Sequence, residues 1–216
     1  MKKESSVLLK KLTVGQMGVN CYILVDDVTR ETVVIDPGDE ASYLAGQLSE
    51  LHARPVAILA THGHFDHILA AFELQMIYHI PFRMSAGDSF LLGRMSETAE
   101  HFLGHTIVEL PPKITATLAD HERIKFGGNN LAVFSLSGHT PGSVGFYCKK
   151  QQMLFVGDTI FSDGSVGRTD FSYSDSKKLE ASISRILSLP DTTILYPGHG
   201  GETSVMKEKQ YHSVKL

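Results

Sequence analysis

The sequence has few of the residues that build disulfide frameworks, and it has no strong excess of one charge. Among 216 residues there is no tryptophan, and there are two cysteines and eight prolines. Cys21 and Cys148 are too few for a disulfide framework and do not have the C-x-x-C spacing of a zinc ribbon, so we expect both to be small buried residues. The formal net charge of −4 supplies no overall basic field, which argues against nucleic acid or a membrane surface as a partner.

Long hydrophobic runs are also missing. Near the N-terminus an apolar patch covers only residues 7–9, which is too short for the core of a signal peptide. No run approaches the ~18–20 residues needed to span a bilayer. With 42% hydrophobic and 20% charged residues and no linker or low-complexity tract, we expect a single domain over residues 1–216, in the cytoplasm, as a monomer or small homo-oligomer.

The hydrophobic pattern predicts two strand-rich segments, each accompanied by helices. We expect strands at residues 7–14, 21–25, 32–35, 55–60, 123–126, 131–136, 144–148, 153–156 and 193–196, and helices at residues 39–52, 67–78, 176–189 and 202–212. Residues 86–121 carry no clear period and are expected to form short helices and a loop that could cover a site. This pattern predicts an α/β (α+β) fold in which two sheets pack together with helices outside.

Histidine is the first sign of function. There are eleven, and three of them lie in the segment THGHFDH at residues 61–67, directly after the apolar run 55–60. Extended backbone places residues two apart on one side, so His62 and His64 can converge on one cation. Asp66 and His67 are adjacent and point in different directions, which leaves them free for a second cation. Imidazole and carboxylate ligands suit zinc, iron or manganese.

Three further candidate ligands occur in the same local setting, just past an apolar strand and beside a glycine. They are His139 in SGHTPG, Asp158 in GDT and His199 in PGHG. Strand ends that meet along one edge of a sheet would gather all seven groups. A lone histidine is more often a core residue than a ligand, but this cluster favours metal. A purely structural metal module is the alternative, although seven ligands for two metals leave open positions, as catalytic sites do.

In order and spacing, these motifs resemble those of the metallo-β-lactamase fold superfamily, over nearly the whole chain and including the DPG at residues 36–38. The resemblance implies a four-layer αββα sandwich with a two-metal site at the edge of the sheets. It assigns His62, His64 and His139 to one metal. It assigns Asp66, His67 and His199 to the other, with Asp158 bridging the two. Two divalent ions per chain are therefore expected, with zinc as the first choice and iron or manganese as alternatives.

Residues 161–170, FSDGSVGRTD, narrow the resemblance to hydroxyacylglutathione hydrolases (glyoxalase II-like) and the related persulfide dioxygenases. In those relatives a basic residue at the place of Arg168 helps to hold glutathione, so Arg168 is a candidate substrate contact. Alternatively, Arg168 pairs with Asp170 and fixes the loop. The sequence shown lacks the C-terminal helical domain of the long relatives and is more similar to the short bacterial proteins, which leaves the thiol carrier open.

The chemistry that this resemblance implies is hydrolysis of a small-molecule thioester, which could be derived from glutathione. Two cations that share a water would supply hydroxide at neutral pH. Asp66 and Asp158 are the expected catalytic carboxylates, and Asp158 would keep the metal spacing and orient the water. Asp36 is expected only to support a ligand histidine through a hydrogen bond.

Other activities on this scaffold differ in what they require. A mononuclear-iron persulfide (sulfur) dioxygenase shares most of the motifs and stays the main alternative. Zinc β-lactamases commonly use a cysteine ligand and lack a ligand at the place of His67, and a nuclease would need a basic surface. Neither of these two activities fits the sequence as well as a thioesterase.

Overall fold

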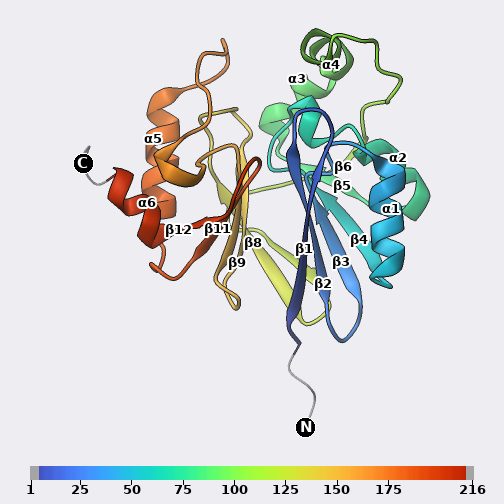
Figure 1. The fold of residues 1–216 in the computed structure, drawn as a ribbon, viewed down its shortest axis with the longest axis horizontal. Helices are drawn as coiled ribbons and strands as arrows, with labels where there is room; N and C mark the ends of the chain where they lie inside the picture. Colours follow the sequence, from blue (N-terminus) through green and yellow to red (C-terminus); the bar gives the residue numbers. More distant parts are fainter. Residues whose placement is uncertain (1–4, 213–216) are drawn as a thin grey trace.

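Two β-sheets pack face to face, and helices cover their outer faces (Figure 1). A computed structural model describes residues 5–212. Each sheet has six strands, in the order β1-β2-β3-β4-β5-β6 and β12-β11-β10-β9-β8-β7. Helices α1 and α2 lie against the first sheet, and α5 and α6 lie against the second. This is the mixed α/β sandwich predicted from the sequence.

The first sheet begins as an antiparallel meander and continues with parallel strands. Strands β1, β2 and β3 pair antiparallel, whereas β3, β4, β5 and β6 pair parallel. Their bounds are Val7–Val14, Val19–Asp26, Glu31–Ile35, Arg54–Leu59, Phe82–Met84 and Ile114–Thr117.

All eight residues of β2 are buried because both faces of this strand are covered. Ile23 belongs to the core under the helices, and its neighbour Leu24 belongs to the core between the sheets. The two-residue period of a strand thus feeds two hydrophobic cores from one segment.

The second sheet is antiparallel except for the parallel pair β10–β11. Its strands are β7 (Arg123–Phe126), β8 (Asn129–Ser135), β9 (Val144–Cys148), β10 (Met153–Gly157), β11 (Ile194–Pro197) and β12 (Thr203–Ser204). The turn between β7 and β8 consists of Gly127 and Gly128, so the two asparagines that follow belong to the strand. Cys21 and Cys148 are buried and free, as expected.

The helices bury one side each against the sheets. Their bounds are α1 Ala41–Glu50, α2 Ala71–Tyr78, α3 Ser89–Leu92, α4 Met95–Leu103, α5 Ser176–Leu187 and α6 Val205–His212, with short 3-10 turns η1 Phe65–His67, η2 Ala86–Asp88 and η3 Ser162–Gly164. Helix α5 starts where the Asp175 side chain accepts a hydrogen bond from Lys178 N at 3.1 Å, and it buries Leu179, Ile183 and Ile186. No helix in residues 5–212 is long and apolar enough to cross a membrane.

Three parts of the pattern differ from the prediction. The helix expected at residues 67–78 begins only at Ala71, because residues 65–67 form a 3-10 turn and Ile68 has a non-helical φ of −137°. Residues Thr203–Ser204 form strand β12, so the helix expected at residues 202–212 begins only at Val205. Strands β5 and β6 were not predicted either. They have three and four residues, and three of the four in β6 are exposed, so tertiary pairing rather than an apolar pattern defines them.

Candidate metal centre

Strand ends bring all seven predicted ligand residues together at one edge of the sandwich. The segment after β4 supplies four of them, and the segments after β8, β10 and β11 supply one each. The seven form three overlapping groups in which the ligand atoms lie within 4.8 Å of one another. The groups are His62, His64 and His139; His62, His67 and Asp158; and Asp66, His67 and His199.

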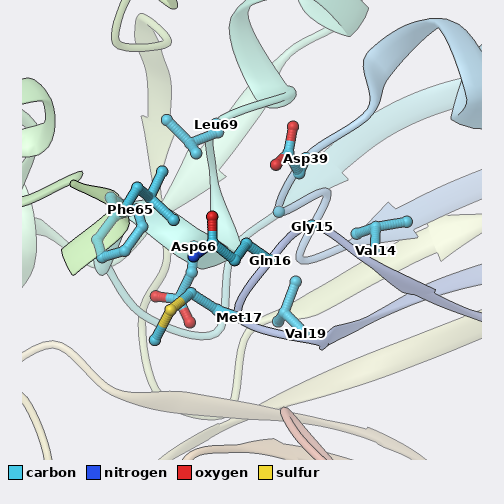
Figure 2. Close-up of a pocket in the computed structure, with 11 residues that line it drawn as sticks. Val14, Gly15, Gln16, Met17, Val19, Asp39, Phe65, Asp66 and Leu69 are labelled. Carbon is cyan, nitrogen blue, oxygen red and sulfur yellow. The ribbon is translucent and has the colours of Figure 1, made fainter. Parts of the chain in front are cut away.

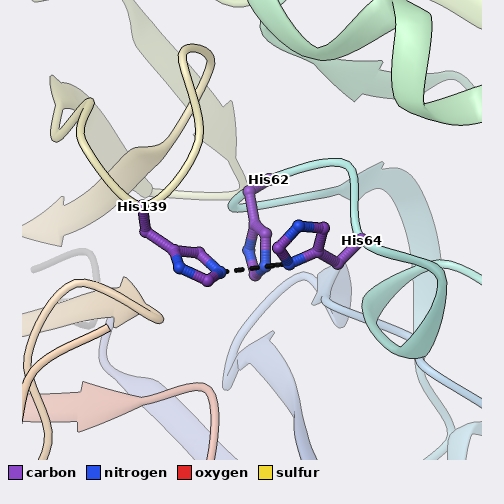
Figure 3. Close-up of side chains that lie close together, drawn as sticks. All are labelled: His62, His64 and His139. Atoms are coloured by element: carbon purple, nitrogen blue, oxygen red, sulfur yellow. Dashed lines mark hydrogen bonds between the residues drawn. The ribbon is translucent and has the colours of Figure 1, made fainter. Parts of the chain in front are cut away.

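The first group consists of three imidazole rings that face one another (Figure 3). Nδ1 of His64 lies 3.1 Å from Nε2 of His62 and 3.0 Å from Nε2 of His139. The rings are nearly perpendicular, with interplanar angles of 78° for His62 and His64 and 87° for His64 and His139. Three ring nitrogens that converge on one point are the donor set expected for a cation.

Asp66, His67 and His199 form the group that we call the second ligand group, and it contains a carboxylate. Oδ2 of Asp66 lies 3.3 Å from Nε2 of His199 and 3.8 Å from Nε2 of His67. Asp158 lies between the two groups. Its Oδ1 is 3.5 Å from His67 Nε2, and its Oδ2 is 3.6 Å from His199 Nε2 and 3.8 Å from His139 Nε2.

Two buried atoms test whether these residues fit metal ions. Within residues 5–212, Nε2 of His67 and Oδ1 of Asp158 are buried without a hydrogen-bond partner. Buried polar atoms without partners are costly, and a divalent cation between them would satisfy both. The residues therefore fit a metal centre. The donor types accept zinc, iron or manganese.

A network behind His67 fixes its orientation. Nδ1 of His67 lies 3.0 Å from Oδ2 of Asp36, and Asp36 in turn accepts hydrogen bonds from Thr61 N at 2.7 Å and Thr61 Oγ1 at 2.6 Å. A proton on Nδ1 leaves the lone pair on Nε2 directed at the cluster. The hydrogen bond expected between Asp36 and a histidine of the cluster is therefore present. Its φ of 51° is unusual for a non-glycine residue.

Outer contacts to the first group come from residues that the sequence did not single out. Tyr173 OH lies 2.9 Å from Nε2 of His64. The fully buried Asp88 accepts hydrogen bonds from the loops that carry the histidines, at Gly63 N, Thr140 Oγ1 and Gly142 N. No local pattern marks these two residues, because their partners lie far away in the sequence.

Burial and neighbouring charges lower the pKa of two histidines in the centre and raise the pKa of a third. Burial and the nearby His139 lower the pKa of His64 to about 3, and burial with the neighbouring histidines also lowers the pKa of His62. For His67, burial opposes the charged form, but the carboxylates of Asp158, Asp66 and Asp36 outweigh it and raise its pKa to about 10. His62 and His64 are therefore neutral lone-pair donors at neutral pH.

A pocket of about 200 Å³ opens over the centre. Asp66, Asp158 and three of the histidines form its polar floor, and the walls are Met17, Phe65, Thr98, Phe102, Arg168, Phe171 and Tyr173. A separate crevice of about 10 Å³ lies beside the floor, between the β1–β2 turn and η1, and reaches Met17, Phe65 and Asp66 (Figure 2). The crevice has room for about one water molecule.

The pairing of Arg168 with Asp170 that the sequence left open is present, and the residue also lies at the pocket. It lines the pocket, and its Nε and Nη2 donate to the two carboxylate oxygens of Asp170 at 3.0 and 2.8 Å. Its backbone carbonyl also lies 2.9 Å from Nδ1 of His139. The residue thus joins the loop after β10 to the first histidine group.

The two packed mixed sheets and the His- and Asp-rich centre at one edge are those of a metal-binding αββα sandwich. A family model described as "Metallo-beta-lactamase superfamily" matches residues 14–199, so the chain belongs to this superfamily.

Individual relatives support the same placement. The chain is 35% identical to hydroxyacylglutathione hydrolase GloC of Haemophilus influenzae over 199 residues, which cover 88% of this chain and 90% of that protein. Among solved structures, it resembles BLEG-1 B3 metallo-beta-lactamase with a TM-score of 0.87 and 33% identity, covering 96% of this chain and 99% of that one. It also resembles TTHA1623 in a di-iron-bound form, with a TM-score of 0.84 and 35% identity, covering 94% of this chain and 98% of that one.

Proposed function

We propose that this protein is a metal-dependent thioesterase of the hydroxyacylglutathione hydrolase type, acting on a small-molecule thioester. The observation that carries the proposal is the position of Asp158 between two complete ligand groups at the floor of an open pocket. The similarity to GloC supports thioester chemistry. The superfamily itself includes several activities, so the centre and its pocket carry the argument rather than the fold.

In this proposal the seven residues divide between two divalent ions. His62, His64 and His139 hold one, Asp66, His67 and His199 hold the other, and Asp158 contacts both. When bound, the ions lower the pKa of water towards neutrality and polarise a carbonyl group. Zinc is the first choice, and the iron in TTHA1623 keeps iron as an alternative.

The chain's own side chains orient the reactants. Asp158 and Asp66 are each 13% exposed, and both face the pocket, where their oxygens can accept hydrogen bonds from the attacking water. Arg168 contacts the substrate from the wall. Water forms the new C–O bond to the acyl carbon, the C–S bond breaks, and the electron pair leaves with the thiolate. A thiol pKa of ~8.5 makes a strong general acid unnecessary for this leaving group.

The test is release of free thiol from S-lactoylglutathione by metal-loaded protein, compared with protein stripped by EDTA. Chelator-sensitive release that returns on adding metal supports the proposal. An absence of release from protein with two ions bound, for this and for simpler thioesters, would contradict it.

The number and kind of bound metal ions would distinguish this proposal from the dioxygenase alternative, and the second ligand group favours two ions. A mononuclear site would leave Asp66 and His199 without a metal to bind, although they lie 3.3 Å apart beside His67. One iron per chain together with oxygen uptake on a persulfide would favour the dioxygenase instead.

A further inference from the structure

The walls of the pocket over the centre are mainly aromatic. Phe171 and Tyr173, from the loop between η3 and α5, stack with ring centroids 5.3 Å apart and planes at 8°. Phe65 and Phe102, from η1 and α4, stack at 6.0 Å and 19°. We call these four residues the aromatic lining. They come from segments far apart in the sequence and line one pocket.

The aromatic lining is partly open to solvent although it is apolar. The Phe102 residue is 39% exposed, and Met17, which lines the same pocket from the β1–β2 turn, is 40% exposed. Exposed aromatic surface at the mouth of a candidate active site favours contact with an apolar ligand.

The pocket walls also contain few cationic side chains, which favours an uncharged ligand. Arg168 is the one lysine or arginine among the described lining residues, and its Nε and Nη2 already donate to Asp170. The guanidinium carbon also lies 4.8 Å from the centre of the Phe171 ring. A substrate carboxylate would have only the Nη1–Nη2 side of this arginine open to it and would share the guanidinium charge with Asp170.

Glutathione is a poor match to such walls, because each of its two carboxylates needs a cationic or N–H partner. The pocket is also small. Its volume of about 200 Å³ lies below the ~300–1,000 Å³ of pockets that enclose drug-sized ligands. A single aromatic ring next to the reacting bond fits this space better than a charged tripeptide.

We propose that the preferred substrate is an uncharged thioester with an aromatic group beside the thioester bond, and that this group lies on the aromatic lining. This inference rests on the proposed thioesterase function and specifies its substrate class. The ring could belong to the acyl part or to the thiol part, and the shared chemistry is an uncharged aryl group one carbon from the reacting bond.

Matched pairs of substrates separate the two positions. For the acyl side, kcat/KM is compared for the phenylacetyl and acetyl thioesters of N-acetylcysteamine. For the thiol side, it is compared for the acetyl thioesters of benzyl mercaptan and ethanethiol. S-Lactoylglutathione is the charged reference. We expect the aromatic member of at least one pair to be favoured by about tenfold or more.

A pair of phenylalanine variants links the preference to the pocket. Phe171→Leu removes a ring of the aromatic lining and keeps an apolar side chain, so we expect the preference to fall about tenfold or more in that variant. Phe134→Leu is the matched control, since Phe134 also has an arginine, Arg185, 4.7 Å from its ring centre but lies outside the pocket lining. The preference should be unchanged in Phe134→Leu.

The outcomes distinguish this inference from the thioesterase proposal. Equal rates within both pairs, or a preference for S-lactoylglutathione that Arg168→Ala abolishes, would overturn the aromatic substrate class and leave the thioesterase intact. If no thioester is cleaved, the proposed function fails. Calorimetric binding of benzyl ethyl thioether and of S-methylglutathione to metal-loaded protein then decides. Tighter binding of the aromatic thioether supports an aromatic subsite, and equal or weaker binding overturns it.

Discussion

Oδ2 of Asp88 accepts a hydrogen bond from the backbone N–H of Gly63 at 2.9 Å, between the two histidines His62 and His64. The same carboxylate accepts Thr140 Oγ1 and Gly142 N, each at 2.6 Å, from the loop that carries His139. One buried side chain therefore joins the two loops that form the first ligand group. It sets the separation of these loops through two backbone N–H groups and the Thr140 hydroxyl, and none of these hydrogen bonds involves a histidine ring.

We expect Asp88→Asn to weaken cation binding at the first group by about 10–100-fold, the range typical of groups that orient metal ligands. The amide would place an N–H₂ against donors, so at least one of the three hydrogen bonds is lost. Competition with a chromophoric chelator measures the affinity. Glu97→Gln, on the exposed face of α4, is the control. Unaltered affinity in Asp88→Asn would show that the loops hold their separation without it.

Asp158→Ala should remove metal and activity together. The variant loses the carboxylate whose oxygens lie 3.5 Å from His67 Nε2 and 3.6 Å from His199 Nε2. We expect metal content to fall below two ions per chain and thiol release to fall by about 100-fold or more, since loss of a ligand exceeds the effect of losing an outer partner. Metal analysis of the desalted protein and a thiol assay check this. A variant with full metal content and full activity would contradict the assignment of Asp158 between the ions.

Gly38→Ala should displace Asp66. A Cβ at residue 38 would lie 1.8 Å from the Asp66 carbonyl oxygen and 2.2 Å from Val19 Cγ1, so the backbone would have to move. We expect a loss of about 1–3 kcal/mol in the free energy of unfolding, together with weaker metal binding. Gly46→Ala, in α1 with no atom within 4 Å of the added carbon, should instead stabilise by about 0.5–1 kcal/mol. Urea unfolding of the two variants gives the comparison, and equal stabilities would refute it.

Asp26 should make the stability of the fold depend on acid pH. Burial opposes the charged form of Asp26, but hydrogen bonds from Ser5, Thr29 N at 2.7 Å and Gly128 N at 2.8 Å outweigh it and hold its pKa well below the usual range. A depressed folded-state pKa stabilises the fold above the unfolded value of ~3.9 and loses this effect as the pH falls further.

The variant Asp26→Asn isolates this effect. We expect it to lower the free energy of unfolding by about 1–3 kcal/mol at pH 7, because buried donors lose their acceptor. The difference from the parent protein should narrow as the pH falls below ~3.9. Denaturant titrations in EDTA at several pH values keep metal binding out of the comparison. A difference that is constant down to pH 2 would exclude the Asp26 carboxylate as its origin.

The candidate ligand residues could be predicted from the sequence because each lies in a short, recognisable motif. Four of them lie in one seven-residue segment, and the others follow apolar strands beside glycines, where the edge of a sheet is easily recognised. Asp88 and Tyr173 could not be found in this way. Asp88 bonds to Gly142, 54 positions away, and Tyr173 meets His64 across 109 positions, so only the assembled fold reveals their contacts.

The aromatic lining of the pocket could not be predicted from the sequence either. Phe65 and Phe102 resemble ordinary core residues in the sequence, and Phe171 lies in a loop without periodicity. Their shared pocket arises because η1, α4 and the loop after η3 meet over the centre. Arg168 was identified from its motif, but its pairing with Asp170 and its position over Phe171 required the structure.

The candidate ligands are divided between the two sheets: four follow β4 in the first, and His139, Asp158 and His199 follow strands of the second. Each ligand group takes residues from both sheets, so bound cations would link the two sheets to each other. Ligation of this kind stabilises by mass action, by about 2.7 kcal/mol when free metal is 100 times its dissociation constant. The chain should therefore exchange its amide hydrogens more slowly and resist proteases longer when metal is plentiful. Its lifetime, as well as its catalytic rate, would then depend on the concentration of free metal.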